Sequence, residues 1–251
     1  MHPTFSRDFF ISDWISNFID AKNKISFWGD FSNQSTYEKK IGNNYYNYLL
    51  EYKNVNTFDF YKNKYFFEFF LQKKIKINKT FITKSYISLP INYKNCISFF
   101  IAAPGWAAGD KKNIYSLNNY ISLARLIEKK YNHKIIFLGG KENITDQNLI
   151  PNNYINLIGK TDLVQLAEVI RKSKLLISGD TCAHHMAAAV NTNCVVLGTG
   201  PHPGRFIPYP KSFNIKHKSI LNKNKNSNYL FDVNNIKVSK IIKIIEQILP
   251  K

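Results

Sequence analysis

The pattern of apolar and polar positions divides the chain at about residue 90. After that point, short continuous apolar runs alternate with longer segments whose apolar residues recur three and four positions apart. An apolar run bounded by glycine or proline is typical of a buried strand, whereas the longer period is typical of a helix that covers a sheet. The alternation predicts an α/β fold with a parallel sheet and helices on both faces. We expect strands at 96–102, 134–138, 154–158, 175–177 and 195–197, and helices at 117–131, 163–172, 184–190 and 238–249.

The first 90 residues follow a different pattern, rich in aromatic residues and asparagine. Phe10, Trp14 and Phe18 recur every four residues, which predicts an amphipathic helix whose apolar face packs against a core. The segment 65–71 reads as a second, buried helix, and the polar segment 22–48 is expected to be irregular. No run of strand–helix units is apparent, so this region is interpreted as incomplete, helical and irregular.

Glycines and polar residues follow the expected strands. Right-handed crossovers place the carboxyl ends of parallel strands at one edge of the sheet, where open α/β folds bind ligands. Glycine lets the backbone approach a ligand closely, so we expect the binding site at this edge. The five loops begin at or contain Pro104, Gly139, Gly159, Gly179 and Gly198.

The turn between the strand at 175–177 and the following helix carries Asp180 and Thr181. Taken alone, Asp180 reads as a helix cap. The Thr181 hydroxyl and the N–H groups of the first helical turn are suited to hold a phosphate, because the positive end of the helix dipole points there. His184 and His185 open the helix, and adjacent helical residues point about 100° apart, which makes them poor joint metal ligands.

Lys111 and Lys112 lie in the first of these loops and can reach a phosphate as point charges. No metal cluster, Walker loop, nucleophile elbow or dinucleotide glycine fingerprint is visible in the sequence. We therefore expect a phosphate-bearing ligand, with neither metal nor cofactor.

Composition narrows the classes of partner. Lys and Arg number 35 against 17 Asp and Glu, a net charge of +18. Either a polyanion is the partner, or the charge reflects an AT-rich coding sequence that also over-uses Asn and Ile. The lysines are scattered and no nucleic-acid module is recognised, so nucleic acid is not expected. The three cysteines lack CxxC spacing and no signal peptide or membrane-length apolar run is seen, which favours the cytoplasm.

The segment 178–189, S-G-D-T-C-A-H-H-M-A-A-A, resembles the signature of glycosyltransferase family 9, the heptosyltransferases. Asp180, Thr181 and His185 occupy matching positions, and Cys182 stands where the family commonly has glycine. Other segments agree in order with family motifs over about residues 96–210: the turn at Gly105 with the lysines after it, 137–140, 156–163 and 198–209.

The resemblance implies a GT-B fold of two Rossmann-like domains, with residues 91–251 as the nucleotide-sugar donor-binding domain and 1–90 as an N-terminal remnant and linker. It implies inverting, metal-independent transfer of a sugar, a heptose, from a donor such as ADP-heptose to a lipopolysaccharide-type saccharide or glycolipid. Peripheral contact with the inner membrane would follow. The donor-binding residues it implies are Gly105, Lys111, Lys112, Thr161, Asp180, Thr181, Cys182 and His185.

Two alternatives stay open. The family supplies an Asp general base from a glycine-containing loop of its N-terminal domain, and no such strand-end motif precedes Cys96, so no catalytic residue is assigned. The chain would then be a donor-binding remnant or one half of a split enzyme. The other alternative is a basic protein that binds polyanions or membrane surfaces, which the net charge of +18 suggests.

Overall fold

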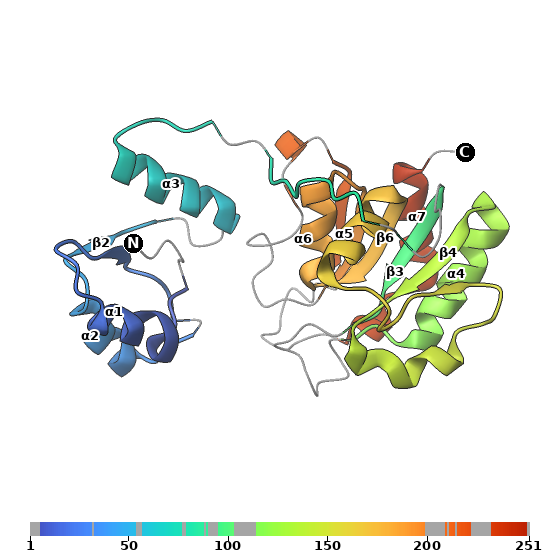
Figure 1. The fold of residues 1–251 in the computed structure, drawn as a ribbon, viewed down its shortest axis with the longest axis horizontal. Coiled ribbons are helices and arrows are strands. Elements are labelled where there is room, and N and C mark those ends of the chain that lie inside the picture. Colours follow the sequence, from blue (N-terminus) through green and yellow to red (C-terminus); the bar gives the residue numbers. More distant parts are fainter. Residues whose placement is uncertain are drawn as a thin grey trace. The chain divides into compact units, whose positions relative to one another are not determined.

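The structure is a computed structural model of the chain. It describes residues 6–31, 33–53, 57–76, 79–87, 89, 95–102, 114–198, 209, 211–213, 215–221 and 232–249, with backbone only for 144–147, 212 and 221. Two compact units follow one another, the first up to Ile77 and the second from Asn78 (Figure 1). The division into domains near residue 90 stays a prediction.

The second unit is built on a six-stranded parallel sheet, as the alternation of apolar runs predicted. Its strand order is β5-β4-β3-β6-β7-β8. Relative to the expected strands, β5 is shorter and β8 is additional. The strands are β3 (Cys96–Phe100), β4 (Lys134–Leu138), β5 (Ile155–Asn156), β6 (Ser173–Gly179), β7 (Cys194–Gly198) and β8 (His217–Leu221).

Helices cover both faces of this sheet, which confirms the predicted α/β architecture (Figure 1). Alternate strand residues point to opposite faces, so Phe99 and Ile177 join one core while Phe100 and Leu176 join the other. The first core is closed by α4 (Leu117–Tyr131) and α7 (Val238–Ile248), and the second by α5 (Leu163–Lys172) and α6 (Cys182–Val190).

Side-chain caps begin two of these helices. The Ser116 side chain accepts a hydrogen bond from the Asn119 N–H at the start of α4. Asp162 and Gln165 form a reciprocal capping box at the start of α5. Among its described residues, this unit also contains the 3-10 segments η4 (Lys141–Leu149), η5 (Lys211–Phe213) and η6 (Val233–Asn235).

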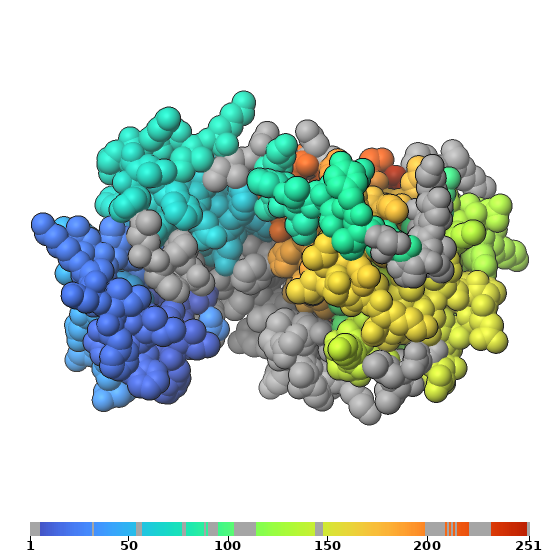
Figure 2. All heavy atoms as spheres, in the orientation of Figure 1, coloured from blue at the N-terminus to red at the C-terminus, as the bar shows by residue number. Residues whose placement is uncertain are grey.

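The segment 79–87 runs across α5 and α6, where Figure 2 shows its green atoms over the yellow atoms of α5. The Ile82 N–H donates to the Ala189 carbonyl over 3.1 Å, and the Arg171 guanidinium donates to the Ile82 carbonyl over 2.8 Å. The Ser85 N–H donates to the buried Glu168 carboxylate over 2.9 Å. These bonds tie the start of the second unit to its helical layer.

The first unit contains a small strand–helix–strand motif, so the expectation of irregular structure at 22–48 was wrong. Here β1 (Ile25–Phe27) pairs in parallel with β2 (Tyr48–Leu50), and α2 (Thr36–Asn43) connects them. Strands of three residues are too short to show a period of two, which explains the error. The expectation that no glycine-containing strand-end motif precedes Cys96 was also wrong, because β1 ends at Phe27 and is followed by Gly29 and Asp30. The remaining elements are η1 (Phe9–Asp13), α1 (Trp14–Phe18) and α3 (Asp59–Leu71).

The aromatic stripe of the first unit was predicted to pack into a core, and this was wrong. Phe10, Trp14 and Phe18 are 67%, 52% and 71% exposed. The opposite side of the same helical segment is buried and polar: the Asp13 carboxylate accepts a hydrogen bond from the Tyr46 hydroxyl over 2.9 Å. A buried ionic and hydrogen-bonded cluster decides which side faces inward.

The segment 65–71 is helical as predicted, but it is not a buried helix. Within that segment of α3, Phe66 is fully buried, whereas Phe69, Phe70 and Leu71 are exposed. The small core that receives Phe66 consists of Ile25, Phe27 and Leu50. Two three-residue strands provide too little apolar surface to cover both sides of a helix this rich in aromatic residues.

Candidate functional site

The strand order of the second unit reverses between β3 and β6. The chain passes from β3 to β4 and β5 in one direction, then returns to place β6 on the other side of β3. Ligands of open α/β sheets bind outside the carboxyl ends of the strands at such a reversal. Phe100 of β3 is paired with Ser178 of β6, so the segments that follow the two strands begin side by side. The predicted turn therefore lies at the topological binding position.

The turn after β6 is fixed by short-range hydrogen bonds. Thr181 caps α6: its hydroxyl accepts a bond from the Ala183 N–H over 3.3 Å. The Ser178 and Thr181 hydroxyls are 3.0 Å apart. Asp180 is therefore not the cap, because it stands one residue too early. A Cβ added at Gly179 would meet only ordinary contacts at 3.8 Å and beyond, so the turn is not crowded at that point.

The Asp180 carboxylate instead bonds the first histidine of α6. His184 Nε2 lies 3.0 Å from Asp180 Oδ1, one helical turn away. The His184 side chain is completely buried, whereas the Asp180 side chain is 17% exposed. His185 is half-buried, and its ring centroid is 3.8 Å from that of His184. The expected divergence of about 100° between adjacent helical residues applies to the Cβ atoms. The side-chain torsions nevertheless bring the two rings together.

Tyr209 and His217 complete an aromatic cluster with His184 and His185. His185 Nδ1 lies 2.8 Å from the Tyr209 hydroxyl, and the Tyr209 N–H donates to His217 Nδ1 over 3.2 Å. Burial lowers the pKa of His185 to about 4 and that of His217 to about 3, and it raises the pKa of Tyr209 to about 12. These three side chains are neutral at pH 7, so the cluster brings no positive charge from them to the turn.

Sequence reasoning did not select two members of this cluster. Tyr209 falls in the closing segment 198–209 of the family resemblance, which was the available signal, but it was not chosen as a site residue. His217 begins β8, a strand without a clear apolar run. The residues beside it in the sequence do not indicate that its ring packs against His184.

Of the other predicted site residues, the structure describes Thr161 and Cys182. Thr161 lies between β5 and the cap of α5, three strands from β6 and thus roughly 14 Å along the same edge at about 4.8 Å per strand. Cys182 is the first residue of α6 and is exposed, and partial desolvation raises the pKa of its thiol. Gly105, Lys111 and Lys112 lie outside the described residues.

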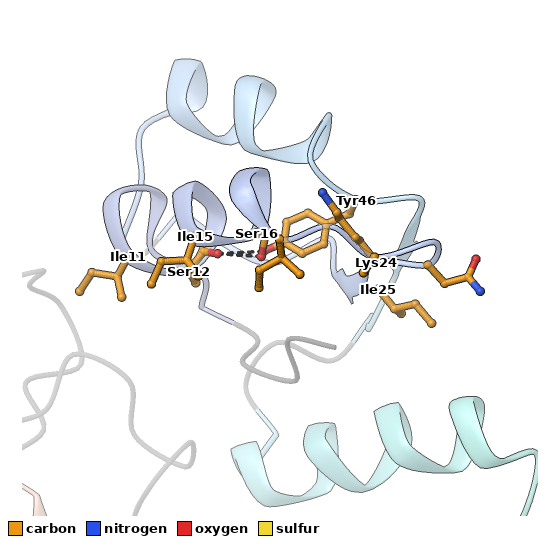
Figure 3. A pocket seen from close by; sticks show the side chains of 10 residues that line it. Ile11, Ser12, Ile15, Ser16, Lys24, Ile25 and Tyr46 are labelled. Carbon is orange, nitrogen blue, oxygen red and sulfur yellow. Dashed lines mark hydrogen bonds between the residues drawn. The ribbon is translucent and has the colours of Figure 1, made fainter.

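In the part of the chain that the structure describes, three or more His, Cys, Asp or Glu side chains are nowhere placed to hold a metal ion. None of the described helices has the length and apolar character needed to cross a bilayer. A hollow of about 240 Å³ in the first unit, drawn in Figure 3, is lined by Ile11, Ile15 and Ile25 with Lys24 and Tyr46 beside them. It contains none of the predicted site residues.

Comparison with known proteins bears on both units. A sequence model described as glycosyltransferase family 9 (heptosyltransferase) matches residues 6–233. A search of curated protein sequences finds no match.

Among solved structures, E. coli heptosyltransferase WaaC with ADP-2-deoxy-2-fluoro heptose is similar with a TM-score of 0.60 at 14% identity, over 90% of this chain and 65% of that one. E. coli ADP-heptose lps heptosyltransferase II gives a TM-score of 0.50 at 17% identity, over 63% of this chain and 48% of that one. A family 9 glycosyl transferase from Veillonella parvula gives a TM-score of 0.50 at 15% identity, over 61% of this chain and 46% of that one.

The chain thus spans less than two thirds of the length of these proteins. At such identities the likeness shows the fold, which is the GT-B-like α/β fold of heptosyltransferases. The family match rests on sequence and extends over most of the described residues of both units. The chain therefore belongs to glycosyltransferase family 9, the heptosyltransferase family.

Proposed function

We propose that this chain binds a nucleotide-diphosphate sugar at the Asp180–Thr181 turn and transfers the sugar to a saccharide or glycolipid acceptor of the lipopolysaccharide type. The observation that carries the proposal is the position of this turn: it opens α6 at the strand-order reversal of a family 9 chain. The proposed donor is ADP-heptose, because a similar heptosyltransferase was solved with ADP and with an ADP-heptose analogue.

The start of α6 is suited to the diphosphate. N–H groups in the first turn of a helix have no intrahelical acceptor, and the helix dipole attracts negative charge to them. Thr181 fixes the entry of the chain into this turn through its bond to the Ala183 N–H. Lys111 or Lys112, in the loop after β3, would add a positive charge from the neighbouring strand. Cys182, exposed at the first helical position, would lie beside the phosphates.

Asp180 is suited to a different part of the donor. An ionised carboxylate repels a diphosphate at short range, whereas it accepts strong hydrogen bonds from hydroxyl groups. We therefore assign Asp180 to the hydroxyls of the donor sugar. His185 uses Nδ1 in its bond with Tyr209, which leaves Nε2 as the ring nitrogen for the ligand. Thr161, farther along the same edge, is assigned to the nucleotide base.

The proposed reaction is a single displacement with inversion. A base removes the proton of an acceptor hydroxyl, the acceptor oxygen bonds to the anomeric carbon, and the bond from that carbon to the diphosphate breaks. The α6 N–H groups and the lysine stabilise the negative charge that develops on the departing diphosphate. Stabilisation by these groups requires no metal ion. The base is not assigned to any residue of this chain.

We place the protein in the cytoplasm, where nucleotide sugars are made, with peripheral contact at the inner membrane. The support for the membrane contact is the net charge of +18, which attracts anionic lipid. Vesicle sedimentation should show binding to anionic vesicles that weakens with added salt. Absence of binding at low salt would remove this part of the proposal.

Calorimetry with ADP-heptose, and with GDP- and UDP-sugars for comparison, tests the main proposal. We expect ADP-heptose to bind, and Asp180→Ala to weaken binding at least tenfold, about 1.4 kcal/mol. Asp20→Ala, which removes an exposed carboxylate of the first unit, is the matched control and should bind as the unsubstituted chain does. EDTA should leave binding and any transfer unchanged. Binding of none of the nucleotides, or equal binding by an Asp180→Ala, Lys112→Ala double variant, would overturn the proposal.

A further inference from the structure

His184 contacts the carboxylate of Asp180, the candidate ligand-binding group, from the buried side. Its ring is completely buried and its Nε2 lies 3.0 Å from Asp180 Oδ1. A ring with no exposed surface cannot touch the donor or the acceptor, so any role of His184 in the site is exerted through Asp180. Position 184 is not one of the positions that resemble the family signature, so the resemblance assigns it no role.

The protonation of the cluster follows from its hydrogen bonds. A carboxylate only accepts, so His184 carries its proton on Nε2 and donates to Asp180. His217 Nδ1 accepts from the Tyr209 N–H, so the proton of neutral His217 is on Nε2. Among the described residues, His184 Nδ1 has no hydrogen-bond partner. Within the part of the chain that the structure describes, the His184 ring therefore makes its hydrogen bond through Nε2 to Asp180.

The ring of His184 is held on several sides. The rings of His185, His217 and Tyr209 surround it at centroid distances of 3.8, 5.6 and 6.5 Å. His184 lies on α6 itself, one turn after the turn that carries Asp180, so the donor nitrogen is attached to a rigid element. A side chain locked by packing on a helix can fix the orientation of a carboxylate that would otherwise rotate about two torsions.

We propose that His184 is a positioning residue for sugar recognition. It engages Oδ1 of Asp180 and thereby directs the other carboxylate oxygen toward the hydroxyls of the donor sugar. This inference rests on the proposed function of the turn, because it assumes that Asp180 contacts the sugar. It assigns to His184 a contribution to the sugar moiety and none to the diphosphate, since the phosphate-binding N–H groups belong to the α6 backbone.

Substitutions that separate the Nε2 donor from the bulk of the ring provide the test. Glutamine places an N–H donor near the position of Nε2, whereas leucine fills similar space without a donor and asparagine places its donor nearer Nδ1. Calorimetry of the full chain with ADP-heptose and with ADP is the measurement. We expect His184→Leu and His184→Asn to weaken ADP-heptose binding about tenfold while ADP binding stays within twofold. His184→Gln should stay within about threefold of the unsubstituted chain for both ligands.

A double-substitution cycle with Asp180→Ala distinguishes positioning from general damage. If His184 acts through Asp180, His184→Leu should cause no further loss of ADP-heptose binding once Asp180 is absent. Equal weakening of ADP and ADP-heptose, additive losses in the double variant, or unchanged ADP-heptose binding by both His184→Leu and His184→Asn would overturn the inference. If His184→Leu does not fold by circular dichroism, the Asn and Gln pair decides the question. Failure of the unsubstituted chain to bind either ligand would instead overturn the proposed function, and this inference with it.

Discussion

The two units of this chain bury apolar surface to different extents. In the second unit, the helical stripe of α4 is buried: Tyr120, Ile121 and Ala124 pack on a sheet that is covered on both faces. In the first unit, a stripe with similar spacing on η1 and α1 is exposed, with Phe10 and Phe18 at 67% and 71%. The same sequence pattern therefore corresponds to a core in one unit and to a surface in the other.

This difference shows what an apolar stripe specifies. The spacing determines which residues share a face of a helix, but a neighbouring layer must be present to cover that face. Six strands supply such a layer in the second unit, whereas β1 and β2 contribute three residues each in the first. In the first unit, the buried side of the helical segment instead carries Asp13, which pairs with the buried Arg7 just before that segment.

Removing a buried ring from the second unit should cause the largest loss in the free energy of unfolding. Phe137 is fully buried and stacks on Phe99 with ring centroids 5.3 Å apart. Phe137→Ala should lower the free energy of unfolding by about 3–5 kcal/mol. Phe18→Ala, which removes the same atoms from an exposed site, should change it by less than about 0.5 kcal/mol. Urea unfolding, with hydrogen exchange read separately over β4 and α1, measures both. Comparable losses would show that the two units do not differ in this way.

The buried Asp13 carboxylate should be the corresponding critical group of the first unit. It accepts hydrogen bonds from the Tyr46 hydroxyl and the Gln34 amide and lies 3.6 Å from the Arg7 guanidinium. Asp13→Ala leaves the buried Arg7 charge without its partner and should cost about 3 kcal/mol or more in the first unit. Exchange of the α2 amides reports the loss, and Asp20→Ala, at an exposed position, is the control. An Asp13→Ala chain with unchanged exchange would contradict the polar core.

Mild acid should destabilise the second unit selectively. The folded-state pKa values of His185 and His217 are lowered from 6.5 to about 4 and about 3. Below pH 6.5 the unfolded chain takes up protons that the folded chain does not, so folding stability is full above pH 6.5 and falls as the pH drops toward 4. Between pH 6.5 and 5 we expect a loss of roughly 3 kcal/mol, about half from each histidine, and urea unfolding at successive pH values measures it.

His217→Gln is the variant that isolates this effect, and it should reduce the slope of stability against pH. The described residues of the first unit include no histidine. The lowered pKa of Glu68, about 2, contributes only below pH 4.5. Exchange in α2 should therefore change little over the same interval. A second unit whose stability is flat between pH 6.5 and 5 would show that its histidines are not buried in the neutral form.

Polar substitution of the exposed stripe should have the smallest effect on stability. Trp14→Ser with Phe18→Ser should leave the free energy of unfolding within about 0.5 kcal/mol, because both side chains are more than half exposed. The same variant should bind less of a hydrophobic dye and associate less in sedimentation runs, because exposed apolar patches promote association. A loss above 2 kcal/mol would mean that this stripe is a core after all.

The sequence predicted most of the second unit because its signals are strong and redundant. The helices 117–131 and 163–172 are found at the predicted residues, since each combines a long apolar period with a capping residue. The first unit was misread at 22–48 because its strands are three residues long. The aromatic stripe was misread because the periodicity does not reveal that Asp13 and Arg7 form a buried pair.

The candidate site was predicted in part. The local turn at Asp180, Thr181 and His185 follows from one short segment, so sequence and structure agree on its position at the end of β6. The Asp180–His184 bond depends on side-chain torsions, and the contacts of Tyr209 and His217 depend on tertiary packing. Pattern and spacing carry no information on either.

A crystal structure of the chain with ADP is the most direct test of the central claim that the strand-order reversal of the second unit is the donor site. The account predicts the diphosphate within hydrogen-bond distance of the N–H groups of the first α6 turn, with the adenine directed along the sheet edge toward Thr161. ADP bound elsewhere, for example in the hollow lined by Ile11 and Ile15, or no bound nucleotide at saturating concentration, would contradict it.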